Sequence, residues 1–158
     1  MVRDATHRIF ARRKKGETVR RGTTLIELSV VLALFGIVAG IAVPRFADYR
    51  DQIEVDAATN ATVSLLSTAR HAAVRRNAIT AVSFDSMSAV ITVFAGRDTL
   101  ERRPLFALHG VRLGVTRDSI AYAANGMGYG AANTRVILSR GVHADTVTVS
   151  RLGRVRRS

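Results

Sequence analysis

The stretch RRGTTLIEL (residues 20–28) and the apolar run LSVVLALFGIVAGIAV (residues 28–43) decide the organisation of this chain. From Thr24 to Val43 there are 20 residues, which as a helix would rise about 30 Å, close to the thickness of the hydrocarbon core of a bilayer. Glu27 is the only charged residue in that segment. Because a carboxylate in lipid is energetically costly, Glu27 is a candidate functional residue.

The motif GTTLIE (residues 22–27) resembles the prepilin peptidase site of type IV pilins and pseudopilins, where a basic leader ending in Gly precedes Thr-Leu-Ile-Glu and an apolar run. The resemblance implies that a prepilin peptidase cleaves between Gly22 and Thr23 on the cytoplasmic face and that Thr23 is then N-methylated. It also implies that Glu27 neutralises the new terminal amine during filament assembly, and that Pro44 kinks the helix. Thr23 departs from the family pattern, in which Phe is commoner at this position.

Three other interpretations of the same stretch remain open. A secretory signal peptide could be cut near AGIA (residues 39–42), although its apolar centre is usually shorter and carries no acid. Arg20-Arg21 could belong to a twin-arginine export signal, but the run that follows is rather too apolar. A plain membrane anchor explains the length of the segment and leaves the Gly-x-Thr-Leu-Ile-Glu motif unexplained.

The 158 residues suffice for one domain once a leader (residues 1–22) and an anchor (residues 23–44) are set aside. The net charge is +12, and residues 1–22 carry half of it. By the positive-inside rule, this basic leader keeps the N-terminus cytoplasmic, which predicts an inner-membrane protein with a periplasmic C-terminal domain. The sequence contains no Cys, which excludes disulfides and thiolate metal sites.

One helix is predicted from about Thr24 to Asn77, with Pro44 causing a kink or local break. Its second half (residues 45–77) is amphipathic, and we expect the apolar stripe to pack on the C-terminal domain. The acids of this half are expected to lie on a solvated face or, as an alternative, in subunit contacts. The stripe comprises Phe46, Tyr49, Ile53, Ala57, Ala61, Leu65 and Ala69, and the acids are Asp48, Asp51, Glu54 and Asp56.

Residues 78–158 change to a β pattern, with β-branched runs separated by turn residues. We expect a hairpin first, then a segment that Pro104 restricts to an edge strand or irregular structure, and then several short strands. About six or seven strands on one long helix predict an α+β fold with an antiparallel sheet or sandwich. The predicted strands are 80–85, 89–95, 100–108, 111–116, 120–123, 134–139 and 146–150.

This C-terminal half is similar to one branch of the same superfamily, the minor pseudopilins of type II secretion called H and their pilus relatives called FimT. The similarity rests on the order of several short features. These are STARHAAVRRN (residues 67–77), a hairpin ending in FD (residues 84–85), Gly126 and Gly130, and the closing VTVS…GRVR between residues 147 and 156.

No constellation for catalysis or metal binding is evident in the sequence. The histidines His7, His71, His109 and His143 are scattered and lie outside ligand spacing from one another or from a carboxylate. The segment GMGYG (residues 126–130) lacks the Lys and the following helix of a phosphate loop. We therefore predict no enzyme and no cofactor.

The C-terminal arginines are a candidate binding site. Arg151, Arg154, Arg156 and Arg157 lie within the last eight residues, and in an extended strand Arg154 and Arg156 would point to the same side. Guanidinium groups facing one way suit adjacent phosphates, and Gly153 allows close backbone approach. Some FimT-type pilins bind DNA through a Gly-Arg-x-Arg tail, which GRVR (residues 153–156) resembles. The alternative is a basic strand that is solvated or docks on a neighbouring subunit.

Two functions follow, and they can coexist. The first is a minor structural subunit of a type II secretion pseudopilus or a type IV pilus, held in the inner membrane and assembled with other pilin subunits into a filament. The second is a DNA-binding minor pilin that serves DNA uptake in natural transformation. The sequence leaves open which of the two machines the chain serves.

Overall fold

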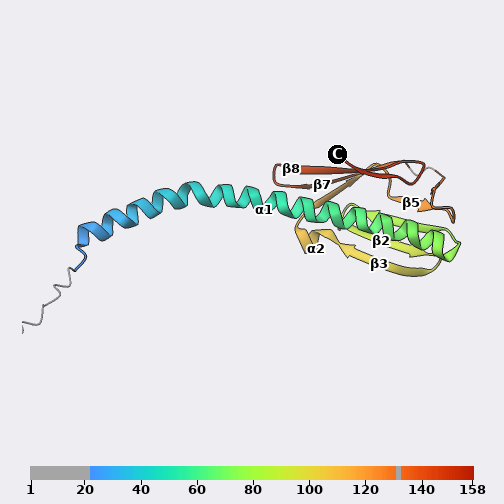
Figure 1. Cartoon of the computed structure of the whole chain (residues 1–158), viewed down its shortest axis with the longest axis horizontal. Helices are drawn as coiled ribbons and strands as arrows, with labels where there is room; N and C mark the ends of the chain where they lie inside the picture. The colour runs from blue at the N-terminus through green and yellow to red at the C-terminus, as the bar shows by residue number, and fades with distance from the viewer. Residues whose placement is uncertain (1–21, 131–132) are drawn as a thin grey trace, which may run out of the picture. The chain divides into compact units, whose positions relative to one another are not determined.

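The computed structural model describes residues 22–130 and 133–158 (Figure 1). The predicted leader, up to residue 21, lies outside these residues. The chain forms two compact units, one ending at Ala39 and one from Gly40 to Ser158. The long helix α1 (Leu25–Arg76) begins in the first unit and supplies the central helix of the second.

The bounds of α1 confirm the long helix predicted from residue 24 to residue 77. The helix is continuous through Pro44, so the local break that the sequence allowed does not occur, and the kink stays a prediction. At the C-terminal end Asn77 adopts a positive φ of 48°, which suits Asn better than most residues. The amide of Ala78 then donates to the carbonyl of Ala73 at 3.1 Å and closes the last turn.

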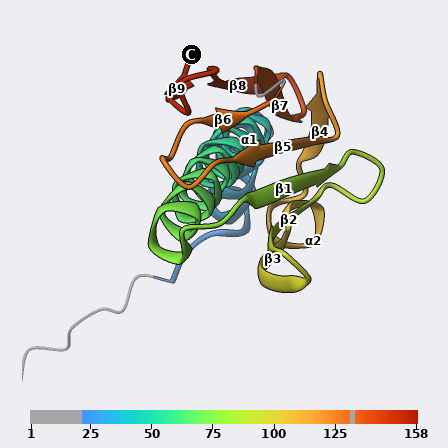
Figure 2. The ribbon, with the colours of Figure 1, turned by 90° about the vertical axis from the view of Figure 1, so that its right-hand side faces the viewer.

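Two antiparallel sheets make up the rest of the second unit. The first has the strand order β3-β2-β1-β5-β6, and the second has the order β4-β7-β8-β9. In Figure 2, strands β1, β2 and β3 of the first sheet lie to the right of α1, β5 and β6 extend above the helix, and β7, β8 and β9 of the second sheet lie above them. The strands are β1 (Thr80–Asp85), β2 (Val90–Ala95), β3 (Asp98–Pro104), β4 (Arg112–Val115), β5 (Ser119–Tyr122), β6 (Gly128–Tyr129), β7 (Thr134–Arg140), β8 (His143–Val149) and β9 (Val155–Arg157).

The α+β architecture is confirmed, and three local details differ from the prediction. Pro104 ends β3 at the edge of the first sheet, as its missing amide requires, but the residues after it form the short helix α2 (Leu105–His109) instead of continuing extended. The strands β6 and β9 were not predicted, since two or three residues carry too little periodicity to be recognised.

The buried face of α1 also differs from the predicted stripe. Leu65 and Ala69 are buried as expected, whereas Phe46, Tyr49 and Ile53 are exposed. Burial on the helix begins only at Val55, so Phe46, Tyr49 and Ile53 are left uncovered by the described residues. The buried positions are Val55, Ala58, Thr59, Thr62, Leu65, Leu66, Ala69, Ala72 and Ala73.

Two threonines enter this core because their hydroxyl groups are satisfied within the helix. Thr59 donates to the carbonyl of Val55 at 2.8 Å, and Thr62 donates to that of Ala58 at 2.9 Å. A hydroxyl bonded to the carbonyl four residues earlier removes most of the cost of burying it. A pattern built only on apolar residues could not include these positions.

Three of the four acids predicted to be solvated in the second half of α1 are paired within the domain, which corrects the interpretation favoured from the sequence at these positions, whereas Asp48 is exposed. Asp51 accepts from Nε of Arg140 at 2.7 Å, and Glu54 lies 2.9 Å from Nδ1 of His109. Asp56 pairs with Arg157. Three acids of one helix thus bind α2, β7 and β9, and the residues they meet are 55 to 101 positions away along the chain.

Candidate processing site and arginine-lined hollow

The predicted cleavage site lies immediately before the helix. Gly22 and Thr23 are exposed and outside regular structure. Thr24 is the N-cap of α1, because its Oγ1 accepts from the amide of Glu27 at 3.2 Å and its carbonyl accepts from the amide of Leu28 at 3.1 Å. The bond between Gly22 and Thr23 is therefore in accessible, non-helical backbone, as a peptidase requires.

Glu27 occupies the first turn of α1, where the unpaired amides of the helix start favour a negative charge. The residues that follow it expose their apolar side chains throughout the first unit, as Leu32 and Phe35 illustrate with 62% and 68% exposure. α1 is long and apolar enough here to cross a membrane. Among the residues that the structure describes, none covers the apolar side chains of this segment.

At the other end of the chain, a tight turn connects β8 to β9. The amide of Gly153 donates to the carbonyl of Ser150 at 2.9 Å, and the amide of Ser150 donates to that of Arg154 at 2.9 Å. Gly153 is buried with a φ of +72°, and a Cβ there would stand 2.5 Å from the carbonyl oxygen of Gly126. The close backbone approach predicted at Gly153 is therefore made by Gly126 of the same chain. Arg151 is exposed, and its carbonyl accepts from the amide of Gly128 at 3.0 Å.

Arg157 differs from the other predicted arginines because its guanidinium is engaged by two carboxylates. It pairs with Asp56 of α1 and Asp145 of β8. Burial of the guanidinium works against its charge, yet these two hydrogen-bonded acids raise the pKa of Arg157 above its ordinary value. Arg157 therefore fastens the last strand to the helix and is poorly placed to bind a ligand.

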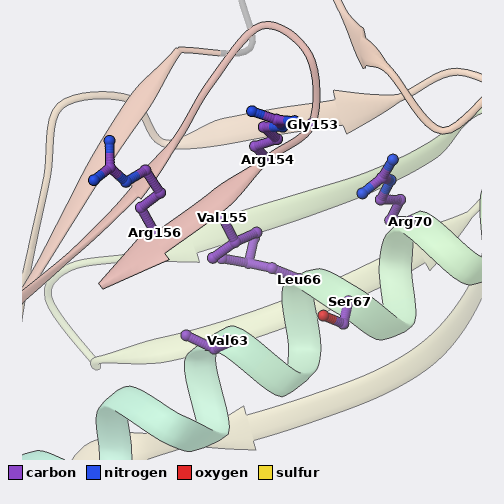
Figure 3. Close-up of a pocket in the computed structure, with 8 residues that line it drawn as sticks. All are labelled: Val63, Leu66, Ser67, Arg70, Gly153, Arg154, Val155 and Arg156. Atoms are coloured by element: carbon purple, nitrogen blue, oxygen red, sulfur yellow. The ribbon is translucent and has the colours of Figure 1, made fainter. Parts of the chain in front are cut away.

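Arg154 and Arg156 border an open hollow of about 500 Å³ between β9 and α1. Figure 3 shows Val155 pointing toward Leu66 while both arginines remain at the edge. Arg70 of α1 contributes a third guanidinium to the same hollow, beside Ser67. Within the part of the chain that the structure describes, these three arginines form no ion pair. The arrangement can bind an anion that spans several guanidinium groups.

Among the described residues, His109 and Glu54 are the one close pairing of a histidine with a carboxylate, with Nδ1 and Oε2 2.9 Å apart. The hydrogen bond from His109 lowers the pKa of Glu54. Across residues 22–130 and 133–158, His, Asp and Glu side chains form no group of three that could hold a metal ion. His7 lies outside the described residues.

Some parts of these sites had a signal in the sequence and others did not. The spacing Thr24-x-x-Glu27 is that of a helix N-cap followed by an acid and would have located the start of α1. The contribution of Arg70 had no local signal, because α1 brings it to residues more than 80 positions later in the chain. Asp56, one of the two acids that bind Arg157, lies 101 positions earlier in the sequence. Only the fold reveals this pair.

Part of the sequence matches known proteins. Residues 18–43 match the family model described as the prokaryotic N-terminal methylation motif. A fimbrial protein of Pseudomonas aeruginosa is 44% identical over 55 residues, which cover 35% of each chain. The type IV narrow pilus major component PilA5 of Thermus thermophilus is 56% identical over 32 residues, 20% of this chain and 28% of that protein. The chain thus matches about a third of the length of these relatives.

The fold of the chain is similar to that of solved structures. The type IV minor pilin FimU of Pseudomonas aeruginosa superposes with a TM-score of 0.59 at 14% identity, over 70% of this chain and 92% of FimU. The minor pseudopilin EpsH from the type 2 secretion system of Vibrio cholerae gives a TM-score of 0.53 at 13% identity, over 66% of this chain and 96% of EpsH. At such low identity the similarity establishes the fold, a long N-terminal helix packed on antiparallel sheets.

Proposed function

We propose that the chain is a member of the type IV pilin and pseudopilin superfamily, and that it is a minor structural subunit of a type II secretion pseudopilus or a type IV pilus. The observation that carries this proposal is the contrast within α1. Its first part is apolar, exposed and charged only at Glu27, whereas its second part is buried in a folded domain. A filament in which the first parts pack together would cover that surface, and a membrane would cover it before assembly.

In this function the leader is removed between Gly22 and Thr23 by a prepilin peptidase, and Thr23 is N-methylated. The N-cap at Thr24 supports this step because it leaves the scissile bond outside the helix. The matched methylation motif supports it independently. The N-terminus would be cytoplasmic and the β domain periplasmic until the subunit enters the filament.

Substitution of Gly22 tests the cleavage site. Gly22→Leu should leave the leader attached, because a side chain would occupy the position that enters the peptidase. Gly36→Leu is the matched control, since Gly36 is also exposed and has open space around its Cα. Intact mass and N-terminal sequence of membrane-extracted protein are the measurements. A mature N-terminus at Thr23 in the Gly22 variant, or a wild-type N-terminus near Ala42, would refute the proposed site.

Glu27 is proposed to meet the free amine of Thr23, on a neighbouring subunit, when protomers assemble. An opposite-charge contact is stronger in a low-dielectric environment than in water, although desolvation offsets part of the gain. Glu27→Val should therefore insert into the membrane normally and be incorporated poorly into sheared filaments. Ser29→Val, two residues further along the same helix, should assemble normally. Equal incorporation of both variants would remove this role from Glu27.

The proposal also concerns the branch of the superfamily and whether the chain serves a pilus or a secretion system. The order of the C-terminal features supports placement among the H and FimT types. The fold is compatible with a pilus as well as a secretion role, since FimU and EpsH come from one of each. Copurification with filaments from pilus-producing or secretion-competent cells would distinguish the two machines.

DNA binding is a second proposed function, and the hollow beside β9 favours it. Arg70, Arg154 and Arg156 border one open surface, and Arg157 is already engaged by acids. Duplex or single-stranded DNA would place consecutive phosphates along these guanidinium groups. The affinity should then fall with salt, with a log–log slope of about 0.9 for each phosphate neutralised in duplex DNA.

Gel-shift titration at two salt concentrations tests DNA binding, using the fragment from Ile53 onward, which retains every buried residue of the core. Arg154→Ala, Arg156→Ala and Arg70→Ala should each weaken binding and reduce the salt slope by about one phosphate. Arg97→Ala, in the exposed turn between β2 and β3, is the matched control and should change binding little. Absence of a shift at low salt would exclude the DNA-binding function and leave the structural one intact.

A further inference from the structure

Large apolar side chains are exposed at several connections of the β domain, and three of them belong to α2 and the β7–β8 turn. Phe106 and Leu108 of α2 are 62% and 53% exposed, and Val142, in the turn between β7 and β8, is 87% exposed. Turns and short surface helices are usually polar, and clustered exposed apolar residues mark interaction sites. These three residues are called the apolar tips below.

Contacts with the same stretch of α1 bring the apolar tips to one end of the domain. Arg140, beside the β7–β8 turn, binds Asp51 of α1 and the backbone carbonyl of His109, the last residue of α2. His109 in turn contacts Glu54. Figure 1 shows α2 and the β7–β8 turn at the end of the domain that α1 enters.

The distance along α1 limits how far this end can lie from a bilayer. The apolar run of the helix ends at Val43, and Asp51 follows eight residues later, a rise of about 12 Å. The headgroup layer occupies roughly 5–8 Å on each side of the hydrocarbon core. With the helix along the membrane normal, Asp51 would stand only about 4–7 Å beyond the headgroup layer, and any tilt of the helix would bring this end of the domain closer.

The charges around the apolar tips match a phospholipid surface. Arg112 borders a hollow together with Phe106 and Arg140. Arg45 and Arg50 follow the end of the apolar run, in a stretch of α1 whose residues are all exposed. Of the acids nearby, Asp51 and Glu54 are paired within the domain, which leaves Asp48 as the exposed acid of this stretch. Arginine side chains at a membrane surface bind lipid phosphates, and apolar side chains beside them enter the interface.

We propose that this end of the domain docks on the phospholipid surface while the subunit waits in the membrane, with Phe106, Leu108 and Val142 inserted among the headgroups. The inference rests on the proposed membrane anchor. Docking would hold the domain at a fixed height and orientation, and assembly into a filament would release it. The surface is distinct from the arginine-lined hollow beside β9.

Single-cysteine labelling can test the proposal on the full chain, since the sequence contains no Cys. An environment-sensitive fluorophore is placed on Val142→Cys, on Arg97→Cys and on Val38→Cys in separate preparations. Each is reconstituted in phosphatidylcholine vesicles whose acyl chains carry bromine near the headgroup as a quencher. Val142 reports the apolar tips, Arg97 reports an exposed turn at the other end of β2, and Val38 reports the anchor.

The proposal predicts quenching at Val142 and Val38 and little quenching at Arg97. Equal, weak quenching at Val142 and Arg97, with Val38 quenched, would overturn docking and leave the anchor standing. Absence of quenching at Val38 would overturn the anchor and docking together. Self-quenching between labels at Val142 that disappears on dilution with unlabelled chain would assign this end to a contact between copies and likewise overturn docking.

Two further measurements separate the apolar and charged contributions. Phe106→Ser combined with Leu108→Ser should reduce quenching of the Val142 label to the level of the Arg97 label, and both side chains are exposed enough for the fold to persist, which far-UV circular dichroism checks. Addition of phosphatidylglycerol to the vesicles should increase quenching at Val142, and Arg112→Ala should reduce that increase. Unchanged quenching in either measurement would refute the contribution concerned.

Discussion

The first and second parts of α1 contain the same types of apolar residue, but these are exposed in the first part and buried in the second. Leu32 is 62% exposed and Leu66 is fully buried, although both are helical leucines in one continuous element. Leu66 is covered by sheets of its own chain, whereas no described residue covers Leu32. In the proposed function a bilayer or other subunits would cover it, so that one helix would serve an intramolecular core and an intermolecular one. The two halves should respond differently to the same substitution.

Leu66→Ala and Leu32→Ala give the largest expected difference. Removal of the buried Leu66 side chain should lower the free energy of unfolding of the domain by about 3 kcal/mol, because apolar burial and packing are lost together. Leu32→Ala should leave domain unfolding unchanged and reduce the retention of the chain in filaments. Denaturant titration of the detergent-solubilised chain, followed by circular dichroism, measures the first effect. Equal destabilisation by both substitutions would show that the two parts fold as one unit.

Gly153→Ala and Gly96→Ala compare two glycines of the domain that share a positive φ. The φ values are +72° and +63°, but only at Gly153 would a Cβ meet backbone, at 2.5 Å from the carbonyl of Gly126. Gly96→Ala should cost about 1 kcal/mol for the left-handed conformation alone. Gly153→Ala should cost about 2–3 kcal/mol, because the turn must also move.

The same unfolding titration measures both glycine variants. If the two variants are equally stable, the close contact between Gly153 and the carbonyl of Gly126 contributes nothing to the free energy of unfolding. If Gly153→Ala does lower the free energy of unfolding, a loss of DNA binding in that variant could result from displacement of the turn and would not identify a DNA contact. Arginine substitutions are for that reason the better probes of the hollow.

The first unit was largely predictable, and the second only in outline. The methylation motif, the exposed helix and its starting residue depend on neighbours in sequence, and the spacing from Thr24 to Glu27 even contains the cap. The fold class of the second unit followed from the change of periodicity after residue 77. Its details depend on contacts between distant residues, for which one sequence provides no signal.

The stripe on α1 shows the physical reason for this limit. A three- and four-residue apolar period includes Phe46 and Ile53 and excludes Thr62, yet the first two are exposed and the third is buried. Where the sheets begin to cover the helix is decided by the lengths of strands and turns, not by the helix sequence. Likewise Arg157 appeared equivalent to Arg156 until the fold placed Asp56 and Asp145 around it.

Arg157→Ala and Arg156→Ala test that distinction between neighbouring arginines. Loss of Arg157 leaves two acids without their partner, and it should lower the free energy of unfolding by about 1 kcal/mol, less at high salt because the pairs are partly exposed. Arg156→Ala should leave stability within about 0.5 kcal/mol of the parent. In DNA binding the order should reverse, with Arg156 the more important. A larger loss of stability in Arg156→Ala than in Arg157→Ala would contradict the assignment of Arg157 to the stability of the domain and of Arg156 to DNA binding.

Tyr122→Phe should have the smallest effect at neutral pH and a distinct effect in alkali. The ring is fully buried, and its hydroxyl has no hydrogen-bond partner within the described residues. Burial raises the pKa of Tyr122 from 10.0 to about 12, against a smaller opposing influence of the Arg70 charge. Between these two values the unfolded state loses the phenol proton while the folded state keeps it. The free energy of unfolding is therefore unaffected by this group below pH 10 and decreases as the pH rises toward 12.

Tyr122→Phe removes both the unpaired hydroxyl and the titration. At neutral pH it should change stability by no more than about 1 kcal/mol, in the stabilising direction, because a buried hydroxyl without a partner is costly. Between pH 10 and 12 the variant should lose less stability than the parent. Tyr129→Phe, at an exposed position, is the matched control and should retain the parental alkaline decline. If Tyr122→Phe retains that decline too, the buried phenol does not titrate as its surroundings require, and the core around it must admit solvent.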